Sequence, residues 1–174
     1  MRELNTSNFG IVIAWLIPGF ITLCGLSLLS PELARWLNGS ASGALTVGGF
    51  LYVTLASLTL GLIVSTIRWA TVDVIHHRSG LARPSLKFSR LQSRTTAFLM
   101  LVEHRYRFYQ FYANSAVAVL VATTCWLLAG RSLGVPLLST VIEAILLAGS
   151  RDSLRGYYEE AAQLLGRAKQ RNTH

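Results

Sequence analysis

Long stretches without charge constrain this chain more than any other feature. Residues 9–29, 45–67 and 108–130 contain no Asp, Glu, Lys or Arg, and residues 132–150 contain only Glu143. A helix needs about 20 apolar residues to cross a hydrocarbon core about 30 Å thick. The sequence therefore predicts four transmembrane helices, in an all-α, integral membrane four-helix bundle.

The composition excludes several other classes of protein. Of the 174 residues, 52% are hydrophobic and only 14% are charged, whereas a soluble domain carries about 25% charged residues. A chain this apolar is not disordered. With only two cysteines, Cys24 and Cys125, a disulfide scaffold is excluded. At this length we expect a single membrane domain over residues 1–174.

The basic residues set the expected orientation. All 16 Lys and Arg residues except Arg35 and Arg131 lie on one side of the four spans. The positive-inside rule then places both termini and the connection 68–107 in the cytoplasm. The net charge of +8 therefore encodes topology, and it favours membrane lipid over nucleic acid as a partner. The residues expected at lipid headgroups are Arg78, Arg83, Lys87, Arg90 and Arg94.

Helices are expected to extend beyond the spans. Residues 68–78 continue the second span until Gly80, and from Leu91 a third helix runs unbroken into the third span. In the tail, residues 151–168, apolar side chains recur at helical spacing. The sequence therefore predicts cytoplasmic extensions of the second and third spans, and an amphipathic C-terminal helix that continues the fourth span.

A carboxylate and two imidazoles share one face of the first extension. Asp73, His76 and His77 are spaced by about one helical turn, and Glu103 or His104 would complete a shell around a divalent metal. Our main interpretation contains no cofactor: Asp73 pairs with a nearby arginine, and the histidines lie at the headgroup level. A divalent metal site is the alternative.

A polar stripe runs along the third helix from the cytoplasm into the membrane edge. Polar groups that face lipid are costly, so this stripe should face the bundle interior, toward Asp73, or a neighbouring subunit. It forms either a vestibule or partner surface, or a network that fixes helix packing. Its members are Glu103, Tyr106, Arg107, Gln110 and Asn114. The opposite face, with Arg105, Tyr109 and Tyr112, suits headgroups.

Glu143 is the one charge inside a predicted span. It lies about 12 Å deep at 1.5 Å per residue, where a carboxylate is neutral, paired or facing water. Ser57 and Thr59 lie at a similar depth in the second span. We predict either a pore or ion site formed by these residues, or a protonated Glu143 bonded to a neighbour.

Along the second span, positions four apart carry small residues except at Val53, namely Gly49, Ser57, Gly61 and Ser65. Such residues let helix backbones approach closely, which predicts a packing face. In the first span, Pro18 and Gly19 predict a kink.

Two segments carry a resemblance to a known group of proteins. Residues 68–78 contain Arg68, Trp69, Asp73 and the pair His76-His77, and residues 104–114 read HRYRFYQFYAN. Both resemble segments of small, four-pass bacterial inner-membrane proteins with no assigned function. The resemblance implies a bacterial inner membrane and no activity.

These observations predict a non-enzymatic multi-pass membrane protein that forms a homo-oligomer. It would anchor or sense a cytoplasmic protein through its basic face, or form a pore with Glu143. One alternative is an intramembrane metalloprotein or enzyme that uses Asp73, His76 and His77 with Glu103. Another is a small ion or proton transporter that uses Glu143.

Overall fold

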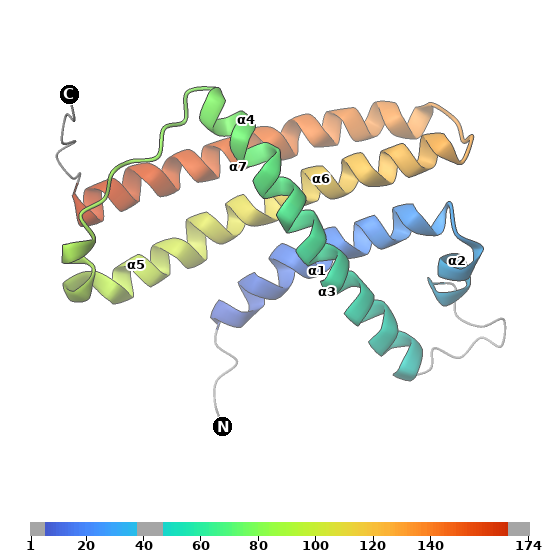
Figure 1. The fold of residues 1–174 in the computed structure, drawn as a ribbon, viewed down its shortest axis with the longest axis horizontal. Coiled ribbons are helices and arrows are strands. Elements are labelled where there is room, and N and C mark those ends of the chain that lie inside the picture. The colour runs from blue at the N-terminus through green and yellow to red at the C-terminus, as the bar shows by residue number, and fades with distance from the viewer. Residues whose placement is uncertain (1–5, 38–46, 167–174) are drawn as a thin grey trace.

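The computed structural model describes residues 6–37 and 47–166, and in these ranges the chain is helical and forms no strand (Figure 1). The elements are α1 (Thr6–Ser27), α2 (Pro31–Leu37), α3 (Val47–Ala70), α4 (Val72–Arg78), two 3₁₀ turns (Phe88–Arg90 and Gln92–Arg94), α5 (Thr95–Leu101), a π-helical segment (Val102–Tyr106), α6 (Arg107–Leu128) and α7 (Gly134–Leu165). The prediction of an all-helical protein is confirmed.

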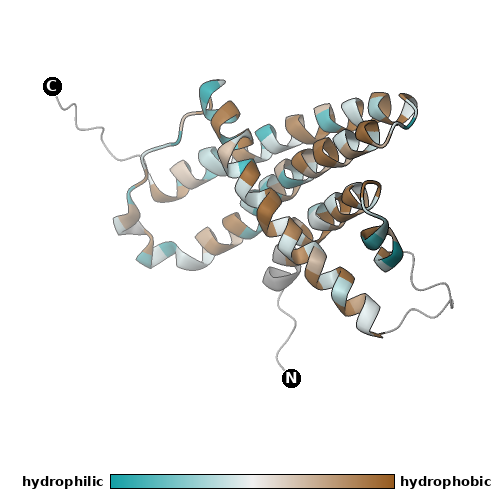
Figure 2. Ribbon diagram, turned by 45° about the vertical axis from the view of Figure 1, so that its right-hand side comes forward, coloured by the Kyte–Doolittle hydropathy of each residue, from teal (hydrophilic) through white to brown (hydrophobic). Residues whose placement is uncertain are grey.

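Three helical stretches are long and apolar enough to cross a membrane. They are Val47–Arg78, Gln92–Leu128 and Gly134–Leu165, and each contains all but two residues of one of the predicted spans. In α1 the apolar stretch is shorter, Val12–Ser27. Figure 2 shows hydrophobic residues along α3 and along the halves of α6 and α7 that are joined by the short turn. Crossing by α1, and hence the four-pass count, stays a prediction.

The long helices form a layer with one helix laid across it. α6 is central, with α1 packed on one side and α7 on the other, while α3 crosses α1 and α6 obliquely (Figure 1). α7 packs against α6, α5 and the π segment, and α3 is not among its main neighbours. The predicted membrane-embedded four-helix bundle therefore stays a prediction, and the described helices pack chiefly as the pairs α1–α3, α1–α6 and α6–α7.

The oblique crossing depends on glycine. A Cβ atom added to Gly19 would lie 1.7 Å from the carbonyl oxygen of Ser57, and one added to Gly61 would lie 2.1 Å from that of Trp15. The backbones of α1 and α3 are thus in direct contact, as small residues permit. The predicted packing face is confirmed at Ser57 and Gly61, whereas Gly49 and Ser65 are only partly buried.

The proline of α1 is matched by an asparagine of α6. Pro18 lacks a backbone N–H, so the carbonyl of Ala14 loses its helical partner. The side-chain amide of Asn114 donates to that carbonyl oxygen at 2.8 Å, and both residues are fully buried. In apolar surroundings a proline is tolerated when a neighbouring helix satisfies the freed backbone group in this way.

The helical extensions form, with two irregularities that the sequence pattern did not reveal. The chain from α3 to α4 breaks at Thr71, and α4 ends before Gly80, whose φ of +93° favours glycine. The predicted third helix starts with 3₁₀ turns and contains the π segment before α6.

The tail helix and the fourth span are one continuous helix, α7, which ends at Leu165 rather than at residue 168. Residues 167 and 168 lie outside the described ranges.

The match between Pro18 and Asn114 is testable by a double-mutant cycle. Asn114→Leu should lower the free energy of unfolding by about 1–3 kcal/mol, because it leaves the Ala14 carbonyl unpaired. In a Pro18→Ala background the loss should be smaller, because the new N–H at position 18 bonds that carbonyl. Reversible unfolding of the four proteins in detergent measures the coupling. An equal loss in both backgrounds contradicts the match.

Candidate functional site

A buried ion pair lies where α3, α4 and α6 meet. The guanidinium of Arg68 donates from Nη1 to Asp73 Oδ1 at 2.8 Å, and only 5% and 11% of the two side chains are exposed. The same Nη1 donates to the hydroxyl of Tyr109 at 3.0 Å, and that hydroxyl donates to Asp73. The Arg68 guanidinium also lies 5.1 Å from the centre of the Tyr109 ring. These three side chains are the Arg68 cluster.

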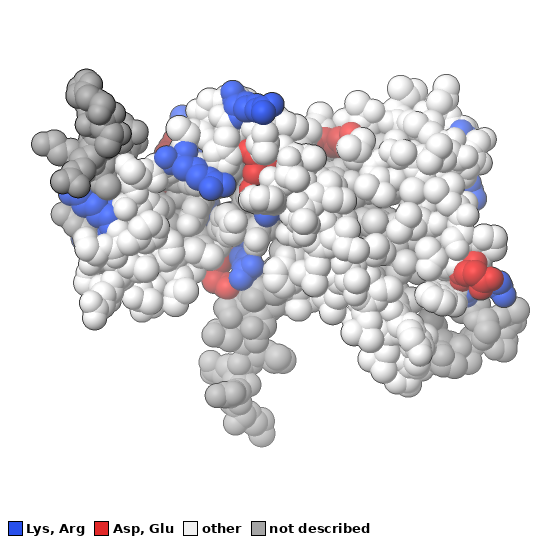
Figure 3. Space-filling model, viewed as in Figure 1, with Lys and Arg blue, Asp and Glu red and all other residues white. Residues whose placement is uncertain are grey.

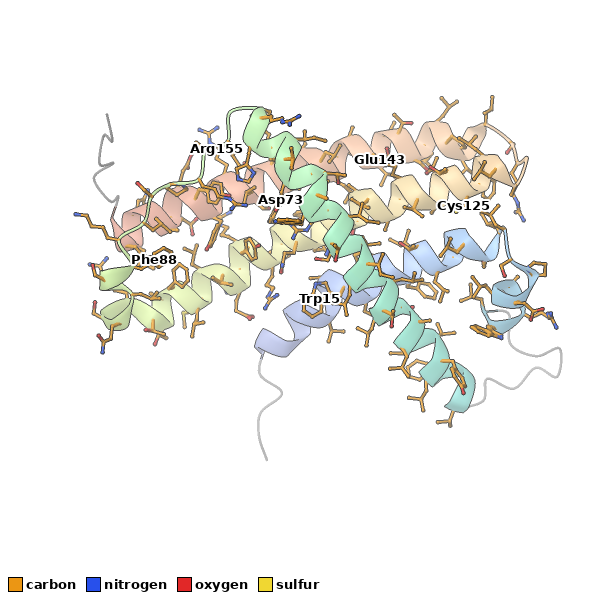
Figure 4. All side chains as sticks on the ribbon, viewed as in Figure 1. Trp15, Asp73, Phe88, Cys125, Glu143 and Arg155 are labelled. Carbon is orange, nitrogen blue, oxygen red and sulfur yellow. The ribbon has the colours of Figure 1, made fainter. Side chains whose placement is uncertain are left out.

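The break at Thr71 creates this cluster. Arg68 lies in the last turn of α3 and Asp73 in the first turn of α4, so each charge is favoured by the dipole of its own helix end. The Thr71 N–H is shared between the carbonyls of Ile67 and Arg68, which tightens the junction. The predicted pairing of Asp73 with an arginine is confirmed. Figure 4 shows Asp73 directed from α4 toward α6.

Both histidines of α4 bond to α7. The Ser150 hydroxyl donates to the carbonyl of Leu147 at 2.8 Å, so it accepts the Nε2–H of His76, also at 2.8 Å. His77 uses Nδ1 on the carbonyl of Asp73, while its Nε2 faces Arg83 Nε at 3.0 Å and the Tyr158 hydroxyl at 3.1 Å. Since the Arg83 Nε–H can only donate, His77 Nε2 accepts from it.

The metal-ligand set predicted from the sequence does not come together. The described residues contain no group of three or more His, Cys, Asp or Glu side chains placed to hold a metal. Asp73 and the two histidines each bond to other partners, as given above. Glu103 lies beside α1 near Gly10, 3.9 Å from where a Cβ of that glycine would be, and His104 is exposed.

The predicted polar stripe faces α1 rather than Asp73. Asn114 bonds to Ala14, and Arg107 packs beside Gly10 and donates to Gln110 Oε1 at 2.9 Å. Tyr106 diverges from the stripe and packs its ring against those of Tyr109 and Tyr157. This geometry matches the interpretation of the stripe as a network that fixes helix packing.

Tyr109 is the residue that sequence reasoning misplaced. It was expected on a headgroup face, but it is 1% exposed and belongs to the Arg68 cluster. Because α6 is the central helix, residues on several of its faces are buried between positions 109 and 118. The assumption of one packed face and one headgroup face therefore fails for this helix.

Beyond the apolar segments, α5, the π segment and the start of α6 run beside the second half of α7, and α4 lies against them. We call this pair of helical segments the stem. Arg105 bridges to Glu160 at 2.8 Å, Arg94 donates to the carbonyl of Leu164 at 2.6 Å, and Arg151 donates to the carbonyl of Ser79 at 2.9 Å. Figure 3 shows most charged side chains gathered toward this end of the molecule, with a broad uncharged surface beside them.

The predicted headgroup residues are only partly free for lipid. Arg83 and Arg94 are exposed yet bond to His77 and to the end of α7. The Lys87 backbone N–H donates to Gly166, while its side chain and that of Arg78 are exposed. The Arg90 side chain lies outside the described part.

The predicted ion-site residues do not lie together, because Glu143 is on α7 and the other two are on different faces of α3. Glu143 is half-buried on α7, in register with the partly covered Ser139 and Leu146 and the buried Ser150, so it lies on the side packed against α6 (Figure 4). Ser57 is buried at the α1–α3 crossing, and Thr59 is exposed on α3. The structure therefore does not unite these three residues.

Fold and site together describe an all-helical protein with three candidate membrane-spanning helices and a polar junction at one end of them. No protein-family model, curated protein or solved structure matches the chain.

The Arg68 cluster should be essential for stability. Asp73→Asn leaves the Arg68 charge buried and unpaired, which should cost about 3–5 kcal/mol of the free energy of unfolding. Glu159→Gln is the matched control, because Glu159 pairs with Arg155 on the exposed surface of α7. Unfolding in detergent should show no measurable change for the control. An Asp73→Asn protein as stable as the control contradicts the role of the cluster.

Proposed function

We propose that this chain is a non-enzymatic, four-pass protein of the bacterial inner membrane, with both termini in the cytoplasm. It forms a homo-oligomer and anchors or senses a cytoplasmic protein through its basic face. The observation that carries the proposal is the stem: α5–α6 and α7 continue past the apolar segments as a braced pair, on the side where the positive-inside rule places the cytoplasm.

The basic face, formed by the arginines and the lysine of residues 78–94, contains charges that are bonded within the chain and charges that are not. Arg83 and Arg94 hold the connection after α4 in place through their bonds to His77 and Leu164. Exposed Arg78 and Lys87 lie on the same part of the chain and are available to an acidic protein surface or to anionic lipid. A surface whose backbone is held by internal bonds and whose remaining cations are exposed is suited to binding a protein partner rather than to catalysis.

The oligomer is supported by the uncovered sides of two helices. Only 6% of the most apolar 18-residue segment of α7 is buried within one subunit, whereas 39% of the corresponding segment of α5–α6 is buried. The first turns of α3 are also exposed at Phe50, Leu51 and Tyr52. Lipid covers part of such a surface, and a second copy covering α7 would give this helix neighbours on both sides.

Site-specific photo-cross-linking in cells tests this proposal. A photo-reactive side chain at Ile145, which is exposed on α7, should give a product of twice the 19.1 kDa chain mass. The same side chain at Lys87 should give an adduct with a different protein. Position Arg35, on the predicted outer side, is the control and should give neither. Only uncross-linked chain from both Ile145 and Lys87 refutes the proposal.

Ion or proton handling by Glu143 is the second candidate function. The supporting observation is that Glu143 lies half-buried in the apolar half of α7 and takes part in none of the ion pairs or hydrogen bonds of the described residues. Its position beside α6 favours a site within one subunit over a ring of carboxylates on the axis of an oligomer formed through the uncovered face.

A flux assay on reconstituted vesicles tests this candidate. Glu143→Gln keeps the size of the side chain but removes its ionisable group, so proton or cation flux should fall about 100-fold or more, as expected when an essential ionisable group in a membrane pathway is lost. Glu159→Gln is the control, because it removes an exposed carboxylate from the same helix. Equal flux in both variants excludes Glu143 as the transport group.

A further inference from the structure

His77 joins three segments of the chain at the end of α4. Its Nε2 atom lies 3.0 Å from Nε of Arg83, in the connection that follows α4, and 3.1 Å from the hydroxyl of Tyr158 on α7. The proposed function treats the bond to Arg83 as a fixed brace of the basic face. An imidazole, however, is the side chain that changes its charge between about pH 5 and 8, so this brace is chemically reversible.

The neighbours of His77 determine which of its ring nitrogens carries a proton. The carbonyl oxygen of Asp73 can only accept, so Nδ1 of His77 is protonated and donates to it. The guanidinium of Arg83 can only donate, so Nε2 of His77 holds a free lone pair. A proton added to Nε2 places two N–H groups and two positive charges against each other. The bond to Arg83 therefore requires that Nε2 carries no proton.

The surroundings of His77 favour the release of Arg83 over a new pairing. The titratable and charged groups on the elements packed around it are Asp73, His76 and Arg78 from α4, Arg83 from the connection, and Arg151 and Tyr158 from α7. The one carboxylate of this set, that of Asp73, is already paired with Arg68. The hydroxyl of Tyr158 can accept a hydrogen bond from a protonated Nε2. Protonation thus moves the Nε2 bond from Arg83 to Tyr158.

The bond to Arg83 restrains a stretch of chain between two backbone bonds. On one side, Leu81 lies in the core and its N–H donates to the carbonyl of His76 at 3.1 Å. On the other side, the Lys87 N–H donates to the carbonyl of Gly166 at 3.1 Å. Residues 82–86 between them are exposed or partly exposed. Release of Arg83 therefore loosens this stretch as far as Lys87, while Leu81 stays in the core.

We propose that His77 and Arg83 form an acid-released latch on the basic face. The latch is closed while Nε2 of His77 accepts from Arg83, and it opens as the pH falls and Nε2 takes up a proton. The basic face then gains an unbonded guanidinium and a charged imidazole, so its attraction for an acidic protein surface increases on acidification. This last step rests on the proposed function, whereas the latch itself does not.

Amide hydrogen exchange of the full-length protein in detergent tests the latch. The backbone N–H of Lys87 reports on the loosened stretch, and that of Leu81 is the reference. The ratio of their exchange rates is compared at about pH 7.5 and about pH 5.5, which lie on either side of the ordinary range of an imidazole. The ratio cancels the pH dependence that is common to both amides. It should rise about tenfold at the lower pH, as for the loss of a hydrogen bond to a charged group.

Three variants separate the latch from other effects of pH. His77→Gln keeps an acceptor for Arg83 but takes up no proton, so the ratio should stay low at both pH values. Arg83→Ala removes the donor, so the ratio should be high at both. His104→Gln is the matched control, because His104 is exposed on the π segment. This control should keep the tenfold response of the unaltered protein.

A ratio that does not change with pH in the unaltered protein overturns the latch. A response that persists in His77→Gln, or one that disappears in His104→Gln, overturns the assignment to His77. Failure of the proposed function is distinguishable from these results. Absent cross-links from Ile145 and Lys87, together with a pH response that requires His77, leave the latch standing.

Discussion

The buried pair of Arg68 and Asp73 determines how the two ends of this molecule are joined. A charge removed from water must be paired and hydrogen-bonded, and this pair closes across the irregular junction at Thr71, where α4 continues α3. Tyr109 completes the pair from α6. Once α4 is fixed in this way, its histidines face α7, where they bond Ser150 and Tyr158. α4 is therefore attached to α6 and α7 through polar contacts, in addition to the apolar packing of Val72 and Leu81 against Leu154 and its neighbours in the core.

Within the apolar layer, α1 joins α3 to the central helix α6. Its glycines let α3 and α6 approach to backbone contact, at Gly19 and at Gly25, where an added Cβ would lie 2.6 Å from the Cα atom of Ala122. Its proline removes one helical hydrogen bond, which Asn114 replaces. The close crossing at Gly19 and Gly61 carries the first half of α3 away from α6 and α7 (Figure 1). The exposed apolar residues of that half follow directly from the small residues at the crossing.

The sequence pattern predicted those features that are set by the residues of a single helix, such as its position in the chain and its packing face. Apolar length placed the helices, residues 68–78 were correctly expected to be helical, and small residues marked the crossing at Ser57 and Gly61. Contacts between distant segments, such as Arg105 with Glu160 or His76 with Ser150, leave no periodic signal. The π segment, Val102–Tyr106, has no composition of its own. Tyr109 was misplaced because helical periodicity cannot show that a helix has neighbours on several sides.

Two carboxylates lie near the apolar segments, and their surroundings separate structural from functional roles. Asp73 accepts from Arg68 and Tyr109, so its protonation would break contacts that hold three helices together. Glu143 takes part in no ion pair or hydrogen bond of the described residues, so its charge state can change without breaking such contacts. A group that gains and loses a proton during function must be free in this sense. Asp73 therefore belongs to the contacts that hold the helices together, whereas Glu143 meets this requirement of the proposed ion or proton handling.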